Sequence, residues 1–368
     1  MDKVKVGILG LGAISGIYLK NLTELFREVE VEGVYDLVPE KIETAKKEYG
    51  IAKGYSSMKE LLEDPAIEIV LNLTRPFEHY ETTKAALIAG KHVYSEKPLA
   101  ATYDEGKELA ALAMERGLLL GGAPDTFLGA GIQTCRKLID DGFIGRPIGG
   151  CARMICHGHE SWHPAPEFYY QFGGGPMMDM GPYYLTALVN MLGRVRGLTG
   201  ITSKSFETRT VTSKPHYGQT VQVEVPTHVN GILQFEEGAV VTITTTFDVY
   251  YDNSACLEIY GTRGTLKIPD PNTFGGEVLL LRPEEGVFKE IPLVFDYQEN
   301  SRGLGLADMA KALRTGRGLR AGCEQTLHVL EIMTAFEKSC KEGRFAVLES
   351  PYKRGCAMVN EGISGLLD

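Results

Sequence analysis

A lysine that could transfer protons follows a predicted strand near the middle of the N-terminal half. Residues 91–95 are predicted to form a β-strand, and the triplet Glu96-Lys97-Pro98 comes directly after it. At the carboxyl end of a strand, beside a cationic ligand, the ammonium of Lys97 would be disfavoured. Its pKa would then be lowered toward values that suit acid–base catalysis. The alternative is an ordinary solvated lysine on the surface.

A carboxylate and a phenol follow a glycine-rich loop further along the chain. The loop at 171–176 leads into a helix predicted to start near Met178, and Asp179 and Tyr183 would share one face of it because they are four residues apart. Asp179 could orient a hydroxyl by a charge-assisted hydrogen bond, and Tyr183 could relay the hydroxyl proton if a cation lowered the phenol pKa from about 10. The alternatives are an acid that favours the helix N-terminus and a core aromatic.

A third segment, residues 159–163, matches the H-E-x-x-H signature of zinc peptidases. That mechanism needs both histidines on one continuous helix and a later third ligand, but a glycine before the motif and two prolines just after it leave little room for a helix. We therefore expect no metal here. His159 and His163 could instead bind hydroxyl groups, with Trp162 as an apolar platform; an ordinary surface loop is an equal alternative.

The first thirty-six residues predict the element that would hold a ligand for these groups. A strand at 4–9 runs into the turn Gly10-Leu11-Gly12-Ala13-Ile14-Ser15-Gly16, and apolar residues then recur at helical spacing. Gly10 permits the tight bend, and Gly12 lets backbone amides approach a pyrophosphate at the positive end of the helix. Ser15 occupies the third glycine position of G-x-G-x-x-G, where a small residue is tolerable.

An acidic residue at the end of the next strand completes this dinucleotide-binding pattern. Residues 29–35 are predicted to be a strand, and Asp36 follows about twenty residues after the turn, where a carboxylate accepts hydrogen bonds from the ribose hydroxyls. An anion there would repel a 2′-phosphate. The sequence therefore predicts NAD as the cofactor, with NADP less favoured.

The rest of the chain predicts an α/β protein of two domains. Strands and helices alternate to about residue 123, which predicts a Rossmann domain, a doubly wound parallel sheet, over residues 1–123. Residues 124–368 are predicted to form an α+β domain for substrate binding and oligomerisation. It would contain an antiparallel meander at 220–268, which forms a large, mostly antiparallel open sheet, and two late helices at 306–315 and 324–341.

The glycine turn, the lysine triplet and the Asp179 segment together resemble the Gfo/Idh/MocA family of oxidoreductases over nearly the whole chain. The resemblance implies that Lys97 stands by the nicotinamide and contacts the reacting hydroxyl, and that His79 lies near the cofactor. The family commonly has D-x-G-x-H where this chain places Tyr183, and some sugar-oxidising relatives resemble it in using tyrosine. The resemblance also implies a homodimer or homotetramer.

Candidate site residues follow from these patterns and from the rule that ligands bind at the carboxyl ends of parallel strands. Catalysis is assigned to Lys97, Tyr183 and Asp179. Cofactor contacts are expected from Gly10, Gly12, Ala13, Ile14, Asp36, Thr74, Arg75, Pro76, His79, Glu96 and Lys97. Substrate contacts are expected from Lys97, Asp125, His159, Trp162, His163, Asp179 and Tyr183.

Composition limits the possible partners. The hydrophobic fraction of 43% includes no run long enough to cross a bilayer, and a formal net charge of −10 without a basic run argues against nucleic acid or anionic membranes. Seven cysteines without a C-x-x-C pair, and no signal segment, indicate reduced thiols in the cytoplasm.

The sequence thus predicts an NAD-dependent oxidoreductase that moves a hydride to or from a ring carbon of a sugar, cyclitol or glycoside. Three alternatives remain: a relative that recycles NAD while cleaving a glycosidic bond, a zinc metallopeptidase built on the His159–His163 motif, and a non-catalytic NAD sensor.

Overall fold

The structure is a computed structural model that describes residues 2–250, 256–359, 365 and 367–368. The chain divides into two compact units. The first unit comprises residues 1–130, 294–327 and 355–368, and the second comprises residues 131–293 and 328–354. No helix of the described residues is long and apolar enough to span a bilayer. All seven cysteines are free thiols.

The first unit is built on a six-stranded parallel sheet of order β3-β2-β1-β4-β5-β6. The two central strands, β1 and β4, consist almost wholly of buried residues, most of them apolar, as expected for a sheet covered on both faces. The strands are β1 (Val4–Leu9), β2 (Val29–Tyr35), β3 (Lys53–Gly54), β4 (Ile69–Asn72), β5 (His92–Ser95) and β6 (Leu120–Gly122). The predicted Rossmann sheet is confirmed.

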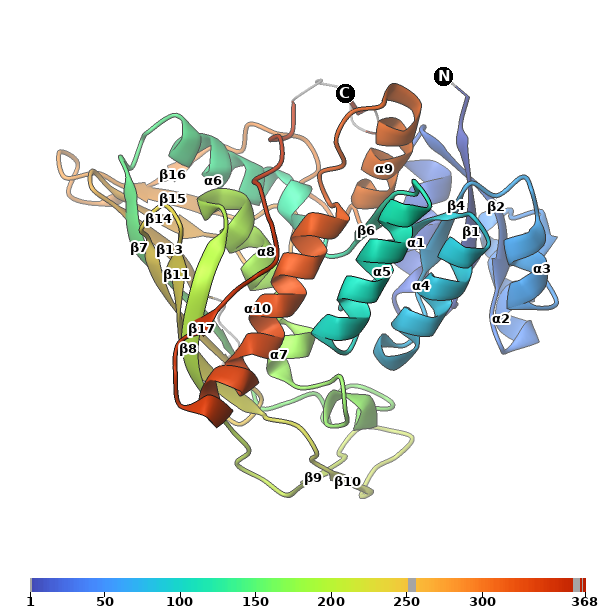
Figure 1. The fold of residues 1–368 in the computed structure, drawn as a ribbon, viewed down its shortest axis with the longest axis horizontal. Coiled ribbons are helices and arrows are strands. Elements are labelled where there is room, and N and C mark those ends of the chain that lie inside the picture. Colours follow the sequence, from blue (N-terminus) through green and yellow to red (C-terminus); the bar gives the residue numbers. More distant parts are fainter. Residues whose placement is uncertain (1, 251–255, 360–364, 366) are drawn as a thin grey trace. The chain divides into compact units, whose positions relative to one another are not determined.

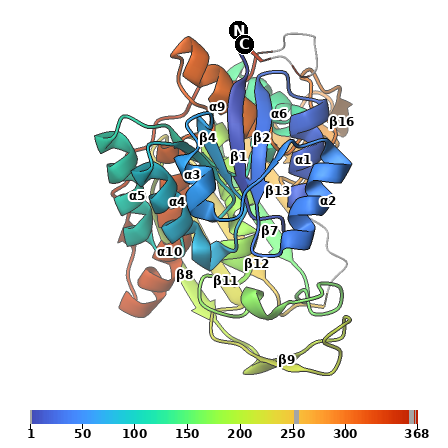
Figure 2. The ribbon, with the colours of Figure 1, turned by 90° about the vertical axis from the view of Figure 1, so that its right-hand side faces the viewer.

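Helices cover both faces of this sheet. Figure 2 shows α1 and α2 along one face and α3, α4 and α5 along the other. Local signals fix several ends: Ser57 and Thr102 accept backbone hydrogen bonds at the starts of α3 and α5, and Pro39 opens α2. The helices are α1 (Ser15–Glu24), α2 (Pro39–Tyr49), α3 (Met58–Glu63), α4 (His79–Ile88) and α5 (Tyr103–Glu115), with the short 3-10 helix η1 (Pro76–Glu78) before α4.

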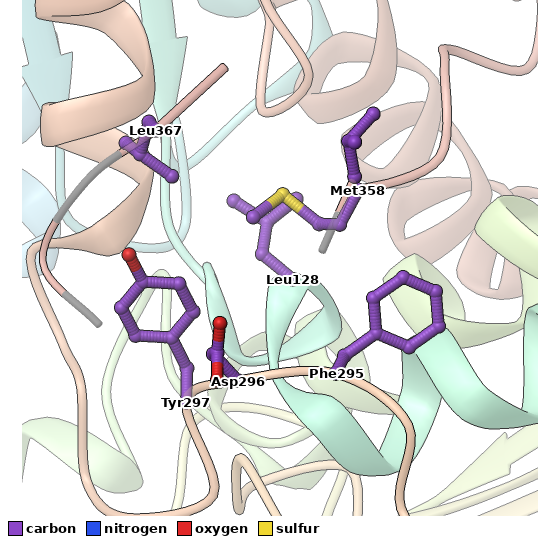
Figure 3. A pocket seen from close by; sticks show the side chains of 7 residues that line it. Leu128, Phe295, Asp296, Tyr297, Met358 and Leu367 are labelled. Carbon is purple, nitrogen blue, oxygen red and sulfur yellow. The ribbon is translucent and has the colours of Figure 1, made fainter. Parts of the chain in front are cut away.

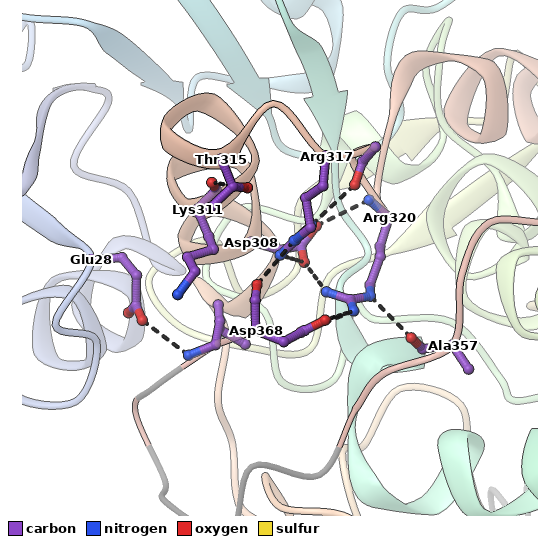
Figure 4. Close-up of polar contacts among 10 residues, drawn as sticks. Glu28, Asp308, Lys311, Thr315, Arg317, Arg320, Ala357 and Asp368 are labelled. Atoms are coloured by element: carbon purple, nitrogen blue, oxygen red, sulfur yellow. Dashed lines mark hydrogen bonds and ion pairs between the residues drawn. The ribbon is translucent and has the colours of Figure 1, made fainter. Parts of the chain in front are cut away.

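The chain returns to the first unit late in the sequence, which differs from the predicted division at residue 123. Helix α9 (Leu304–Thr315) packs against β5 and β6. Its buried Asp308 accepts hydrogen bonds of 2.7 Å from both Arg317 and Arg320, and Arg320 also pairs with Asp368 at 2.6 Å (Figure 4). These ion pairs, which sequence patterning does not reveal, join parts of the late segment to one another. The packing of α9 against β5 and β6 assigns the segment to this unit.

The second unit contains a nine-stranded sheet of order β16-β15-β14-β13-β7-β12-β11-β8-β17. Its strands are β7 (Pro147–Ile155), β8 (Val195–Ser203), β11 (His228–Phe235), β12 (Val240–Thr246), β13 (Cys256–Gly261), β14 (Thr265–Ile268), β15 (Val278–Leu281), β16 (Phe288–Ile291) and β17 (Ala346–Val347). A separate two-stranded ribbon joins β9 (Thr208–Thr210) and β10 (Thr220–Gln222).

The predicted large, mostly antiparallel sheet is confirmed, but the simple meander at 220–268 is wrong. Strand β7 lies between β12 and β13, and it pairs with β12 in parallel. The alternation of Val, Ile and Thr predicts strands but carries no information on which strand enters between them. Part of the predicted meander, residues 251–255, lies outside the described residues.

Four helices of the second unit lie on one side of this sheet (Figure 1). They are α6 (Ala130–Asp140), α7 (Pro176–Asp179), α8 (Gly181–Leu192) and α10 (Cys323–Glu342), whose first residues belong to the first unit. Two glycines of the sheet, Gly200 on β8 and Gly231 on β11, let α10 approach it closely. A Cβ at either position would lie 2.5 or 2.3 Å, respectively, from the ring of Phe336 on α10. The side chains of Ile201 and Ile232 are instead solvent-exposed.

Candidate functional site

The glycine turn of the first unit has the geometry of a phosphate-binding turn. Gly10 has φ of +95°, and a Cβ there would lie 2.7 Å from the carbonyl oxygen of Leu73. A Cβ on Gly12 would meet no atom within 4 Å, so the space in front of this glycine is open. Ser15, at the place of the third glycine, turns its hydroxyl back to the carbonyl of Gly12 at 2.7 Å. A small polar residue thus closes the turn without filling the open space.

Asp36 lies at the carboxyl end of β2, as predicted. Its Oδ2 accepts a 2.7 Å hydrogen bond from the backbone N–H of Leu11, and its Oδ1 accepts one from Val38 at 2.9 Å. These bonds fix the carboxylate beside the glycine turn. Lys41 Nζ lies 3.8 Å from Asp36 Oδ1 on a side chain that is 46% exposed, so it offsets the carboxylate charge only weakly. The turn, the open space and the fixed acid fit a dinucleotide.

The loop after β4 is tied to the loop after β5 through His79. This buried ring lies between the carbonyl oxygens of Pro98, 2.7 Å from Nδ1, and Thr74, 3.0 Å from Nε2. Burial lowers the pKa of His79, which favours the neutral ring, and a neutral ring donates to only one of these two oxygens. Asn72 supports the same loop, because its side chain accepts from the backbone and hydroxyl of Thr74. Arg75 and Pro76 follow at the start of η1.

A buried tyrosine supports the lysine triplet through a hydrogen bond. Tyr18 of α1 donates a 2.7 Å hydrogen bond to Glu96 Oε1, and Glu96 Oε2 accepts from the backbone N–H of Lys97 at 2.9 Å. Burial and the Glu96 charge raise the pKa of Tyr18, so the phenol stays protonated and donates. Lys97 itself is half-buried at the carboxyl end of β5. The ordinary alternative of a fully solvated lysine does not hold.

Asp125, a predicted substrate contact, is occupied by the backbone of its own unit. Its Oδ2 accepts hydrogen bonds from the N–H groups of Gly303 and Gly305 at 2.9 and 3.0 Å, and only 1% of the residue is exposed. Burial raises its pKa to about 6. These contacts indicate that Asp125 fixes the start of α9, which is a structural role.

In the second unit the structure joins two of the predicted residues directly. His159 Nε2 lies 3.1 Å from Asp179 Oδ2, and each side chain is 14% exposed. His159 belongs to the loop after β7, whereas Asp179 is the last residue of α7. A carboxylate bonded to one imidazole nitrogen fixes the ring orientation and the tautomer, which is the usual support of a proton-transferring histidine.

Aromatic rings enclose this pair. The rings of Tyr169 and Phe247 meet the His159 imidazole edge-on, with centroids 4.4 and 4.6 Å away, and Trp162 does so at 5.3 Å. Trp162 is 61% exposed, which suits a platform for the apolar face of a ring. His163 lies beyond it and accepts a hydrogen bond from Ala165 through Nδ1. Burial lowers the pKa of His163.

Tyr183 does not share a helix with Asp179, which corrects the sequence prediction. Helix α7 ends at Asp179, and a new helix, α8, begins at Gly181. Pro182 explains the break, because it has no N–H to continue the hydrogen bonding of α7. Tyr183 lies in the first turn of α8 and is largely buried.

The H-E-x-x-H match has a structural explanation. Its Glu160 is buried, accepts a 2.6 Å hydrogen bond from Arg209 Nε and is also bonded by the phenol of Tyr170. Arg209 is buried as well and pairs with Asp248 at 3.2 Å. A zinc peptidase needs this glutamate as a general base, but here it neutralises an arginine. No group of three metal-ligating side chains occurs among the residues described.

Sequence reasoning missed the residues that support the site. Of these residues, Asn72 could have been noticed in the sequence, because it is the only polar residue of the apolar strand β4. Tyr18, Arg209 and Tyr170 act through partners 78, 49 and 10 residues away, and no local pattern marks them. None of the predicted site residues lines a small hollow in the first unit (Figure 3). It is lined by Leu128, Phe295, Asp296, Tyr297, Met358, Val359 and Leu367.

Two family models match the chain. One, described as an oxidoreductase family with an NAD-binding Rossmann fold, matches residues 4–122, and the other, a GFO/IDH/MocA C-terminal domain, matches residues 132–267. The first match agrees with the predicted dinucleotide fold. Neither model points to a peptidase.

Individual relatives are distant, and they match either most of the chain or only part of it. A scyllo-inositol 2-dehydrogenase (NADP(+)) from Bacillus subtilis is 24% identical over 95% of this chain and 97% of its own. An inositol 2-dehydrogenase/D-chiro-inositol 3-dehydrogenase from Lactiplantibacillus plantarum is 36% identical over 39% of this chain and 42% of its own. Among solved structures, a levoglucosan dehydrogenase in complex with NADH and L-sorbose matches with a TM-score of 0.82 at 20% identity, covering 95% of this chain and 99% of that one.

Proposed function

The chain belongs to the GFO/IDH/MocA family of oxidoreductases, and from this premise we propose that it transfers a hydride between NAD and a hydroxyl-bearing ring carbon of a sugar or cyclitol. The observation that carries the proposal is the similarity over 95% of the chain to a dehydrogenase named for scyllo-inositol. Most of the candidate substrate residues have polar side chains, which supports a hydroxyl-rich substrate.

The first unit supplies the cofactor site in this proposal. Amides of the Gly10–Gly12 turn face the pyrophosphate, and the open space at Gly12 admits it. Asp36 binds the adenosine ribose, and its negative charge favours NAD over NADP. His79 and Asn72 hold the loop of Thr74, Arg75 and Pro76 against the cofactor side of the sheet. When bound there, the cofactor would supply the hydride acceptor or donor.

The candidate catalytic residues act on the reacting hydroxyl in this proposal. Lys97, fixed through Glu96 and Tyr18, binds the hydroxyl oxygen and stabilises negative charge on it. Asp179 orients the substrate by a charge-assisted hydrogen bond, and Tyr183 relays the hydroxyl proton. His159, His163 and the exposed ring of Trp162 contact the rest of the sugar.

The test is a substrate screen with both cofactors. Purified protein is mixed with myo-inositol, scyllo-inositol, D-xylose and levoglucosan, each with NAD and with NADP, and the absorbance of the reduced cofactor is followed. We expect turnover with at least one of these and a preference for NAD. No reduction of either cofactor by any of the four would contradict the proposal.

We further propose that the protein works in the cytoplasm as a homodimer or homotetramer. The seven free thiols suit a reducing compartment. The side of the nine-stranded sheet that bears Ile201 and Ile232, which are 71% and 44% exposed, offers apolar surface for assembly. Light scattering coupled to size-exclusion chromatography tests this, and a monomer at micromolar concentration would contradict it.

A further inference from the structure

We propose that His159, held by Asp179, is the group that finally accepts the proton of the reacting hydroxyl. This inference rests on the proposed function and assigns to His159 a catalytic role, where the sequence predicted only a substrate contact. The motivating observation is the 3.1 Å hydrogen bond between His159 Nε2 and Asp179 Oδ2.

The chemistry requires such an acceptor. A phenol has a pKa near 10, so at neutral pH Tyr183 can take the hydroxyl proton only by passing its own proton onward. An imidazole titrates near neutrality and can keep the proton. In the balanced step, the C–H bond delivers a hydride to NAD⁺, the O–H proton moves to neutral His159, and the products are a ketone, NADH and an imidazolium.

The geometry of the second unit leaves one ring nitrogen for this task. Because Asp179 accepts only from a protonated nitrogen, the pair fixes hydrogen on Nε2 and leaves the lone pair on Nδ1. No other described residue hydrogen-bonds the His159 ring, so Nδ1 is available to a substrate hydroxyl or to an intervening phenol. The carboxylate also stabilises the imidazolium once it forms.

The surroundings favour a single defined proton acceptor. Tyr169, Phe247 and Trp162 hold the imidazole edge-on, which restricts rotation of the ring. Behind the loop, Glu160 and Arg209 neutralise each other. Several titratable and charged groups lie around the imidazole. His163 and Glu160 belong to its own loop, and Tyr169 and Tyr170 lie at the 3-10 helix η3 (Glu167–Tyr169). The others are Asp179 of α7, Arg209 of β9 and Asp248 after β12.

A glutamine substitution separates proton transfer from support of the structure. The side-chain amide of His159→Gln can still donate to Asp179, but it cannot accept and hold a proton. With a substrate found in the screen, we expect kcat to fall about 10²- to 10⁴-fold, the range of general base catalysis, while KM changes much less. We also expect loss of the decline in kcat/KM at low pH. His216→Asn, in the loop between β9 and β10, is the control and should match the wild type.

The outcomes distinguish this inference from the proposed function. An active wild type whose His159→Gln variant retains kcat within threefold, or retains the low-pH decline, overturns the role of His159 and leaves the function standing. A wild type that oxidises no polyol overturns both. If His159→Gln does not fold, ¹⁵N NMR of the wild-type histidines decides. Hydrogen on Nε2 of His159, with a signal that changes in Asp179→Asn, supports the role, and hydrogen on Nδ1 overturns it.

Discussion

The two units hold their candidate residues by different kinds of contact. In the first unit, carboxylates accept hydrogen bonds from the backbone of strand-end loops: Asp36 from the N–H of Leu11 and Glu96 from the N–H of Lys97. One side-chain pair, Tyr18 with Glu96, supports this arrangement. In the second unit, side chains form hydrogen bonds with side chains of distant segments, as in the pairs His159–Asp179 and Glu160–Arg209. Parallel topology alone brings the loops of the first unit to one edge, whereas the second unit needs specific ion pairs to place its groups.

The largest effect is expected when the Lys97 ammonium of the first unit is removed. Lys97→Ala should lower turnover by about 10²- to 10⁴-fold, because the variant cannot bind or stabilise the reacting oxygen. Binding of NAD should change little, because the glycine turn and Asp36 remain. Steady-state kinetics and calorimetric titration with NAD measure the two effects. Lys59→Ala, which alters an exposed lysine of the same unit, is the control. Full activity of Lys97→Ala would remove Lys97 from the mechanism.

Sequence reasoning succeeded where chain order decides the position of a residue. Asp36, His79 and Lys97 follow strands of one parallel sheet, so their strand-end positions could be read from strand spacing, although their common action on one substrate stays a prediction. Sequence reasoning failed where side chains of different loops pair with one another. The partners of Glu160 and Asp179 lie 49 and 20 residues away, and the break between α7 and α8 depends on one proline. Spacing therefore found the residue types of the second unit but not their pairing.

The ion pairs of the second unit should be needed for stability. Arg209→Met leaves the carboxylates of Glu160 and Asp248 buried without their cation, so we expect a loss of about 3–5 kcal/mol in the free energy of unfolding. Arg196→Met, at an exposed position of β8, should change it by less than about 0.5 kcal/mol. Urea unfolding followed by circular dichroism compares the two. Equal stability of both variants would mean that the cluster does not organise this unit.

The first unit also contains one buried carboxyl whose effect depends on pH. The pKa of Asp125 rises from 3.8 to about 6 on folding because of burial. A carboxyl with a raised pKa favours the folded state fully at low pH, and this contribution is lost as the pH rises through about 6. Asp125→Asn lacks this titration. The stability of the wild type relative to the variant should therefore fall by about 3 kcal/mol between pH 3 and pH 7. A constant difference would show that Asp125 titrates normally.

The smallest effect concerns the choice of cofactor. Asp36→Asn keeps the side-chain shape and one acceptor oxygen for Leu11, but it removes the negative charge beside the ribose site. We expect NAD to bind about tenfold more weakly, a loss of about 1.4 kcal/mol, because charge-assisted hydrogen bonds to the ribose become neutral ones. NADP should gain relative to NAD, since no anion now opposes its 2′-phosphate. Glu40→Gln, which removes a charge from the first turn of α2, is the matched control and should leave the NAD to NADP ratio unchanged. The ratio of dissociation constants from fluorescence titration measures the effect. A wild type that already prefers NADP would show that Asp36 does not control cofactor choice, even though it is fixed by the backbone of its own unit.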